Sequence, residues 1–426
     1  MTHETAFEVA TSAIRFGRGV TDEVGMDLVD LGVRRVMVLT DPWLASLPVT
    51  ATVLNSLERS RIHYRLFPKV RVEPTDESFR EAIRFASEGE FEGFVAVGGG
   101  STIDTAKAAN LYSTYPPGDF LDYVNPPIGR GCPVAGPLKP LIAIPTTAGT
   151  GSETTGVAIF DLVKMHVKTG IAHRRLKPTL GLLDPENTRT MPREVAASTG
   201  LDVLSHAVES YTAIPFTQRE RPERPLMRPA YQGSNPISDI WCLQALRMVA
   251  EFLPRAVADP SDDDARAQML LASAYAGIGF GNAGVHLPHG MSYPVSGMVR
   301  EFRPRGYPPE HPMVPHGMSV ILNAPAVFRF TAQASAERYL RVAEALGADV
   351  SRVAQADAGE VVADCVVSLM QRLDIPNGLG AVGYSTSDIP ALVEGTLPQH
   401  RVTKLSPRPA TPENLARLFE KAMRAW

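Results

Sequence analysis

The 426-residue chain has little of what marks several large protein classes. Its three cysteines, Cys132, Cys242 and Cys365, lie too far apart for a disulfide framework or a thiolate metal site. No apolar run approaches the roughly 20 residues that a transmembrane helix needs. The formal net charge of −4 argues against a partner bound by phosphate neutralisation. We therefore expect a globular enzyme or binding protein with no membrane and no nucleic-acid partner.

The N-terminal residues lack the signals of an exported or imported protein. Residues 1–19 contain Glu4 and Glu8 and have no apolar core, so they do not resemble a secretory signal. Their two arginines are too few for a mitochondrial presequence. Together with the scarcity of cysteine, these absences favour a cytoplasmic enzyme, and a mitochondrial one is the alternative.

The first half of the chain alternates short apolar runs with amphipathic stretches. Six β-branched, apolar runs predict buried strands: 34–41, 63–67, 93–101, 140–147, 155–160 and 178–185. Residues 76–89 have the pattern of a helix between two of these strands. Such alternation predicts a mostly parallel sheet covered by helices on both faces. We assign residues 1–190 to this Rossmann-like α/β domain.

The second half changes to long stretches with a period of 3.6 residues. Five such stretches predict helices: 192–213, 238–257, 263–281, 333–347 and 358–374. Two proline- and arginine-rich insertions, at 215–234 and 299–315, interrupt them. We assign residues 191–426 to an all-helical domain.

Two loops of the first half have the composition of an anion-binding site. Residues 95–110, VAVGGGSTIDTAKAAN, combine a strand, three glycines and the start of a helix. Glycines let the backbone approach an anion, and the N-terminus of a helix favours a phosphate, although a tight turn without a ligand is the simpler alternative. A second loop, 144–155, is rich in Gly, Ser and Thr and also follows a strand. Because ligands bind where parallel strands end, the two loops predict a bound dinucleotide.

Asp41 ends the first of these predicted strands. In that place its carboxylate could accept hydrogen bonds from a ribose. The commoner use of an aspartate there is an N-cap or an Asx turn, which remains the alternative.

The second half contains candidate metal ligands. Asp202 and His206 are spaced four residues apart in GLDVLSHAVES, so they share one face of a predicted helix. Two histidine pairs follow in apolar surroundings, and each contains a His-Gly-Met run: His286 with His289, and His311 with His316. Three imidazoles and one carboxylate suit Fe(II) or Zn(II), but the residues alone do not choose within either pair. A dinucleotide beside such a Lewis acid indicates hydride transfer at an alcohol carbon.

Taken together, these motifs resemble the iron-activated, group III alcohol dehydrogenase family over nearly the whole chain. The resemblance is carried by GGGSTIDTAK, PTTAGTGSE, GLDVLSHAVESY, HGM and PHGMS. Within the family, the hydroxyacid–oxoacid transhydrogenase branch is resembled by KVRVEPTDESF, FLDYVNPPIG, RPAYQGSNPISDIW, GIGFGNAGVHLPHGMSYPVSG and LPQHRVTKLSPRP. The resemblance implies an architecture like that of dehydroquinate synthase, with the active site between a dinucleotide domain and a helical domain.

The same resemblance implies the residues of the site. It places the metal ligands at Asp202, His206, His289 and His316 and leaves His286 and His311 in supporting roles. It implies NAD contacts at Asp41, Gly99, Gly100, Ser101, Thr146, Thr147, Thr150 and Lys168. A carboxylate at position 41 favours NAD over NADP, because it repels a 2′-phosphate. Many members carry a second histidine where this chain has Tyr293, so Tyr293 or solvent is left to relay the proton.

The branch implies a ping-pong reaction between two small acids. A hydroxy acid such as 4-hydroxybutyrate reduces bound NAD, and a 2-oxo acid such as 2-oxoglutarate is then reduced. Carboxylate substrates need cationic partners, and both insertions supply candidates: Arg219, Arg221, Arg224, Arg228, Arg300, Arg303 and Arg305. We also expect a homo-oligomer such as a dimer.

Three alternatives accompany this interpretation. The first is a dehydrogenase that exchanges its NAD. The second is a metal- and NAD-dependent lyase or cyclase, which the absence of lysine from 200–211 and 282–297 disfavours. The third is an inactive binding protein, which the complete set of ligand positions disfavours.

Overall fold

The computed structural model describes residues 2–165 and 167–426. The chain divides into two compact units. One is Ala10–Met191, and the other is Pro192–Trp426 together with the N-terminal stretch up to Val9. We keep the domain boundary after residue 190 as a proposal and describe each unit by itself.

A parallel sheet forms the centre of the first unit. Among its described residues, six strands pair in the order β1-β8-β5-β4-β2-β3, and every neighbouring pair is parallel. These strands are β1 (Ala13–Phe16), β2 (Arg35–Leu39), β3 (His63–Phe67), β4 (Gly93–Gly98), β5 (Leu141–Pro145) and β8 (Leu180–Leu183). The predicted parallel α/β fold is therefore confirmed.

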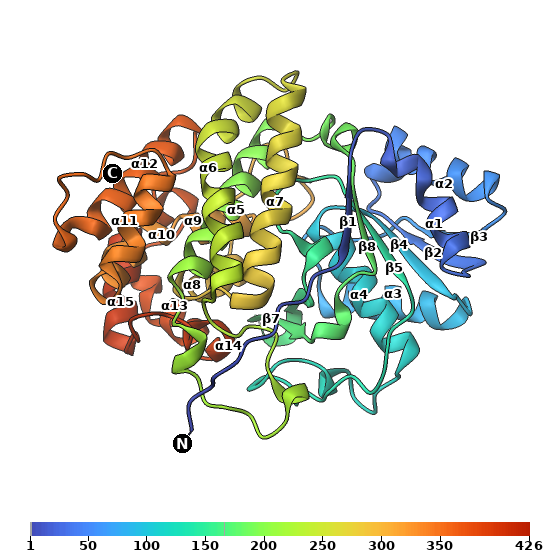
Figure 1. The fold of residues 1–426 in the computed structure, drawn as a ribbon, viewed down its shortest axis with the longest axis horizontal. Coiled ribbons are helices and arrows are strands. Elements are labelled where there is room, and N and C mark those ends of the chain that lie inside the picture. The colour runs from blue at the N-terminus through green and yellow to red at the C-terminus, as the bar shows by residue number, and fades with distance from the viewer. Residues whose placement is uncertain (1, 166) are drawn as a thin grey trace. The chain divides into compact units, whose positions relative to one another are not determined.

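Helices cover both faces of this sheet, as Figure 1 shows. On one face lie α1 (Val24–Asp30) and α2 (Pro48–Arg59), and on the other lie α3 (Asp76–Glu88) and α4 (Gly100–Thr114). Strand β2 shows why the strands of this sheet are apolar at consecutive residues. Alternate side chains of a strand point to opposite faces, and both faces of this sheet are covered by helices. Val36 and Val38 pack with the first pair of helices, whereas Met37 and Leu39 pack with the second pair.

Three strands of this unit differ from the sequence prediction. The strand expected at 155–160 is β6 (Val157–Leu162), which pairs antiparallel with β7 (Val167–Ala172) in a separate two-stranded sheet. Neither β7 nor β1 was predicted. β1 is only four residues long and partly exposed, and Lys168 and Gly170 interrupt the apolar pattern of β7.

Three long helices lie side by side in the second unit (Figure 1): α5 (Arg193–Thr212), α6 (Pro236–Ala258) and α7 (Asp263–Ala283). Nearly every residue of α5 from Ala196 to Thr212 is buried, as expected of a helix enclosed on all sides. The buried residues include Asp202, His206 and Glu209. Because buried polar groups require partners, this helix marks the interior in which a polar site is built.

Shorter helices complete the second unit. They are α8 (Leu287–Gly297), α9 (His316–Ile321), α10 (Ala324–Thr331), α11 (Ala336–Ala345), α12 (Ala358–Arg372), α13 (Ile389–Thr396), α14 (His400–Thr403) and α15 (Pro412–Ala422). All five predicted long helices are present. In the described part of the chain, every helix is too short or too polar to span a bilayer.

Candidate functional site

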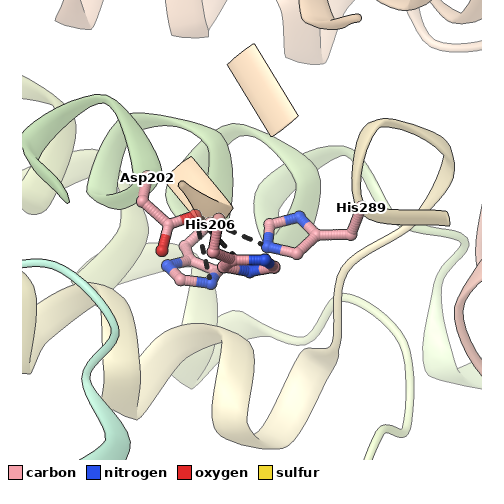
Figure 2. A group of neighbouring side chains, drawn as sticks. Asp202, His206 and His289 are labelled. Atoms are coloured by element: carbon pink, nitrogen blue, oxygen red, sulfur yellow. Dashed lines mark ion pairs between the residues drawn. The ribbon is translucent and has the colours of Figure 1, made fainter. Parts of the chain in front are cut away.

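Four side chains from three helices of the second unit converge on one point. Asp202 and His206 lie one turn apart on α5, His289 is the third residue of α8, and His316 begins α9. One ligand atom from each residue lies within 4.8 Å of the others. Figure 2 shows Asp202, His206 and His289 pointing toward one another. The structure thus brings together all four expected metal ligands.

The spacing of these atoms fits a metal ion better than internal hydrogen bonds. Asp202 Oδ1 lies 3.8 Å from the Nε2 atom of His206, 3.7 Å from that of His289 and 4.0 Å from that of His316. Hydrogen bonds are shorter than this. Ligands about 2.1 Å from a common ion lie about 3.4 Å apart in a tetrahedron. His316 remains 24% exposed, so the cluster is open on that ligand's side.

A buried carboxylate that sequence reasoning missed orients one of the imidazoles. Glu209 is fully buried on α5, and its Oε1 accepts a hydrogen bond from His289 Nδ1 at 2.6 Å. This contact puts the ring hydrogen on Nδ1 and leaves the lone pair on Nε2. Among the described residues, buried His289 Nε2 has no hydrogen-bond partner, as expected of an atom that coordinates a metal. The signal was present in the sequence, because Glu209 follows Asp202 by seven residues and shares its helix face.

Burial controls the ionisation of this pair. It lowers the pKa of His289 to about 3, so the ring is neutral at pH 7, as a ligand must be. Burial also raises the pKa of Glu209 to about 7. The backbone amides of His286 and His289 donate hydrogen bonds to this carboxylate, and these bonds lower its pKa and so oppose the rise.

The repeated His-Gly-Met run has a steric explanation. A Cβ atom on Gly290 would lie 2.7 Å from Thr403 Cγ2 of α14, and one on Gly317 would lie 2.9 Å from Asp202 Cβ. Real Cβ atoms do not approach neighbours this closely. Each glycine therefore lets the turn that carries the preceding histidine pack closely against a neighbouring helix.

The sequence alone did not show which histidine of each pair is a metal ligand. The structure distinguishes them, because His289 and His316 belong to the cluster and His286 and His311 do not. His286 lies outside the cluster as the N-cap of α8, where its Nδ1 accepts a hydrogen bond from the Leu287 amide and its Nε2 contacts Thr212 Oγ1 at 3.0 Å. Both ring nitrogens are thus used in holding α8. His311 also lies outside the cluster.

Tyr293 lies one turn after His289 on α8 and is buried. Its hydroxyl oxygen accepts a hydrogen bond from Arg401 Nη2 at 2.8 Å. Its own hydroxyl hydrogen can therefore be donated to another group. A role in proton relay stays a prediction.

The arginines proposed for substrate carboxylates have varied surroundings. Arg228 pairs with Glu4, at 2.9 Å from Nε to Oε2, and Arg300 pairs with Asp388. Four others are exposed: Arg221, Arg224, Arg303 and Arg305. Arg228 and Arg300 therefore already have carboxylate partners within the protein.

In the first unit, the two loops expected to hold a dinucleotide meet. Gly99 caps α4 and Gly100 begins it. A Cβ on Gly99 would lie 3.0 Å from Thr147 Oγ1, and one on Gly100 would lie 2.6 Å from Thr150 Cγ2. The Thr146 amide also donates to the Gly98 carbonyl at 3.2 Å. The glycine turn, which forms the N-terminus of α4, thus packs directly against the threonine loop.

Two buried lysines of this unit have structural partners. Lys107 Nζ donates to Ser152 Oγ at 2.7 Å and to the Val157 carbonyl at 2.8 Å, which ties α4 to the threonine loop. Lys168 Nζ lies 2.7 Å from Glu73 Oε2 and 3.2 Å from Asp161 Oδ1. Burial would lower the pKa of Lys168, but these carboxylates together raise it. The contact of Lys168 with the cofactor stays a prediction.

The segment before α3 is hydrogen-bonded to the first turn of α4. Glu73 has a φ of 55°, which is unusual for a residue other than glycine. Its amide donates to Ser101 Oγ at 3.2 Å. Such a backbone persists only where its surroundings fix it, and it is concentrated at functional sites.

Asp41 follows β2 at the carboxyl end of the sheet. Its Oδ1 accepts hydrogen bonds from the amides of Trp43 and Leu44, both at 2.9 Å. Burial raises the pKa of its carboxyl group, and these hydrogen bonds act against the rise. The turn-forming role is therefore present, and the ribose role stays a prediction.

Comparison with known proteins adds a family and named relatives. The family model "Iron-containing alcohol dehydrogenase" matches residues 11–185, and "Fe-containing alcohol dehydrogenase family, C-terminal" matches residues 230–423. The mitochondrial hydroxyacid-oxoacid transhydrogenase of Bos taurus is 59% identical over 426 residues, which cover 100% of this chain and 91% of that protein. The protein of the same name from Homo sapiens is 58% identical, with the same coverage.

Solved structures show the same fold. A 1,3-propanediol oxidoreductase is 27% identical with a TM-score of 0.85, over 98% of this chain and 100% of that one. An iron-containing alcohol dehydrogenase from Thermococcus thioreducens is 27% identical with a TM-score of 0.81, over 98% and 99%. These likenesses confirm the predicted fold class.

The names of the relatives correct one expectation. The transhydrogenases of Bos taurus, Homo sapiens and Xenopus laevis are all named mitochondrial, so the prediction of a cytoplasmic enzyme was wrong. That prediction used the absence of a presequence pattern and the scarcity of cysteine. Neither absence is specific to the cytoplasm.

Proposed function

Since the chain belongs to the iron-containing alcohol dehydrogenase family, we propose that it is a hydroxyacid–oxoacid transhydrogenase. A hydroxy acid such as 4-hydroxybutyrate would transfer a hydride to bound NAD and lose its hydroxyl proton, which would give succinate semialdehyde. A 2-oxo acid such as 2-oxoglutarate would then take the hydride and a proton, which would give 2-hydroxyglutarate. The two half-reactions balance, so NAD leaves the cycle unchanged.

The observation that carries this proposal is the cluster of one buried carboxylate and three imidazoles, of which His316 is partly exposed. Its ligands would be Asp202, His206, His289 and His316, with Glu209 fixing the ring of His289. When bound, a divalent metal there supplies a Lewis acid to an alcohol or carbonyl oxygen, and NAD supplies the hydride acceptor. We propose iron(II) as the metal, and the same donor set also accepts zinc.

The remaining roles follow the same proposal. The pyrophosphate would lie at the N-terminus of α4, where helix amides favour an anion. The cofactor contacts would come from Asp41, Gly99, Gly100, Ser101, Thr146, Thr147, Thr150 and Lys168. Tyr293 would move the hydroxyl proton. We also propose a homo-oligomer such as a dimer.

A dehydrogenase that exchanges NAD with solution is the second candidate. The likeness to the 1,3-propanediol oxidoreductase and to the Thermococcus alcohol dehydrogenase favours it. The two candidates differ in how NAD is held, because a ping-pong transhydrogenase needs no free dinucleotide.

One experiment separates them. Purified protein is denatured and searched for NAD by mass spectrometry, and native protein is assayed with 4-hydroxybutyrate and 2-oxoglutarate. We expect retained NAD and formation of 2-hydroxyglutarate without added dinucleotide. Steady NADH production from 4-hydroxybutyrate and free NAD, without an oxo acid, would contradict the transhydrogenase.

A further inference from the structure

Arg401 lies on α14, which packs directly against α8. The close approach of Gly290 and Thr403 joins the two helices beside His289. The guanidinium of Arg401 lies between two phenols. Its Nη2 donates to Tyr293 at 2.8 Å, and its Cζ lies 4.8 Å from the centroid of the Tyr231 ring. Both tyrosines are buried.

In the described part of the chain, the positive charge of Arg401 is not matched by a carboxylate. Within the described ranges 2–165 and 167–426, no acidic side chain forms an ion pair with it, and its enclosed Nη1 atom has no hydrogen-bond partner. Two other partly buried arginines of this unit differ. Arg228 pairs with Glu4, and Arg338 pairs with Asp239 at 2.6 Å. A desolvated cation without a counter-ion is unfavourable, so Arg401 has the surroundings expected of a side chain that pairs with an anionic ligand.

Two routes of contact connect Arg401 to the metal cluster. Through Tyr293 it reaches α8 one turn from His289. Through Tyr231 it reaches Phe280, whose ring lies 6.4 Å from that of Tyr231, and Phe280 stacks on His206 at 3.9 Å and 6°. Arg401 therefore lies beside the cluster within the same unit.

Other cations add to the positive field at this place. Burial lowers the pKa of Lys404, and the charges of Arg219 and Arg401 lower it further. Like charges held near one another favour an anionic ligand.

We propose that Arg401 binds the carboxylate of the substrate, and so selects hydroxy acids and oxo acids over neutral alcohols. This inference depends on the proposed function. Both half-reactions use a substrate with a carboxylate, so one arginine serves the hydroxy acid and the oxo acid in turn. Its planar guanidinium suits two parallel hydrogen bonds to a carboxylate. Arg401 belongs to the run LPQHRVTKLSPRP, whereas the sequence prediction considered only the arginines of the insertions.

The test compares two substrates that differ only at the far end. 4-Hydroxybutyrate carries a carboxylate where 1,4-butanediol carries a neutral CH₂OH group. In Arg401→Gln we expect KM for 4-hydroxybutyrate to rise about 100-fold, the scale of a charge-assisted hydrogen-bond pair. The loss of the hydrogen bond to Tyr293 acts on both substrates alike, so we expect kcat/KM for 1,4-butanediol to fall at least about tenfold less than kcat/KM for 4-hydroxybutyrate, with metal content unchanged. Arg401→Lys keeps the charge and should recover part of the loss.

Arg341→Gln is the matched control, because Arg341 pairs with Glu337 on the exposed surface. Equal losses on both substrates in Arg401→Gln would show that Arg401 only braces Tyr293 and Tyr231, and would overturn the proposal. An unchanged KM for 4-hydroxybutyrate would overturn it as well.

A binding measurement separates failure of this inference from failure of the proposed function. Calorimetric titration with butyrate, which cannot be oxidised as an alcohol, requires no turnover. We expect wild-type protein to bind butyrate and Arg401→Gln to bind it about 100-fold more weakly. Equal butyrate affinities would refute the role of Arg401, whereas wild-type protein that binds butyrate but makes no 2-hydroxyglutarate would refute only the transhydrogenase.

Discussion

Glu209 Oε1 accepts the Nδ1 hydrogen of His289 at 2.6 Å, and Glu209 Oε2 accepts the backbone amide of His286 at 2.7 Å. One buried carboxylate thus fixes both the start of α8 and the direction of an imidazole that faces the metal cluster. Hydrogen-bond partners of this kind set the orientation and basicity of a metal-binding histidine.

Glu209→Gln should weaken metal binding about 10- to 100-fold. A glutamine has one accepting oxygen, so either the His289 ring or the amide on the other side would face its NH₂ group. We would measure metal affinity by competition with a chelator. Glu337→Gln, on the surface, is the control. Unchanged metal affinity in a folded Glu209→Gln protein would show that the carboxylate does not position the ligand.

Substitution of His289 in α8 and of His286, the N-cap of that helix, should have different effects. His289→Ala removes a ligand and should lower metal affinity by more than about 100-fold. His286→Ala should keep the metal but lower the melting temperature, because the ring holds the Leu287 amide and Thr212. Metal analysis and thermal unfolding of both variants are the measurements. Full metal occupancy in His289→Ala would remove it from the ligand set.

The sequence was most informative where a pattern repeats over many residues. The apolar runs of β2, β4 and β5 and the 3.6-residue period of α5, α6 and α7 were sufficient to predict the fold class. β1 was missed because AIRF is short and partly exposed, and its pairing partner β8 lies about 170 residues away. Such a strand is specified by tertiary pairing rather than by its own residues.

The candidate site was predictable only in part. The helical spacing of Asp202 and His206 gave two candidate ligands directly. The neighbouring sequence did not show whether His286 or His289 is the metal ligand. That assignment depends on which of the two histidines is the N-cap of α8. Arg401 was missed for a similar reason. Among residues 2–165 and 167–426 no carboxylate pairs with Arg401, and this is a property of the packed structure. The sequence alone does not distinguish such an arginine from one on the surface.

Substitution of Asp41 should separate its two roles. Asp41→Ala removes the acceptor for two amides and should cost about 1 kcal/mol of stability. Asp41→Asn keeps an accepting oxygen but removes the charge, so it should retain stability. Both variants should bind NADP relatively better than wild type, because the carboxylate no longer repels the 2′-phosphate. Calorimetry with NAD and NADP is the measurement, and an unchanged preference in both would refute the ribose role.

The pairing of Glu4 with Arg228 should make stability depend on pH in the acid range. The hydrogen bond from Arg228 is the main cause that lowers the pKa of Glu4, from 4.5 to about 2. Because the folded pKa lies below the unfolded one, this stabilisation is complete above about pH 4.5 and is lost as the pH falls toward 2. Between pH 6 and pH 3, wild type should lose about 1–2 kcal/mol relative to Glu4→Gln, which has no carboxyl group to titrate there. Denaturant unfolding of both proteins at several pH values measures the difference. A constant difference across this range would mean that the pair does not hold Glu4 ionised, and Arg228 would again be available to bind a substrate carboxylate.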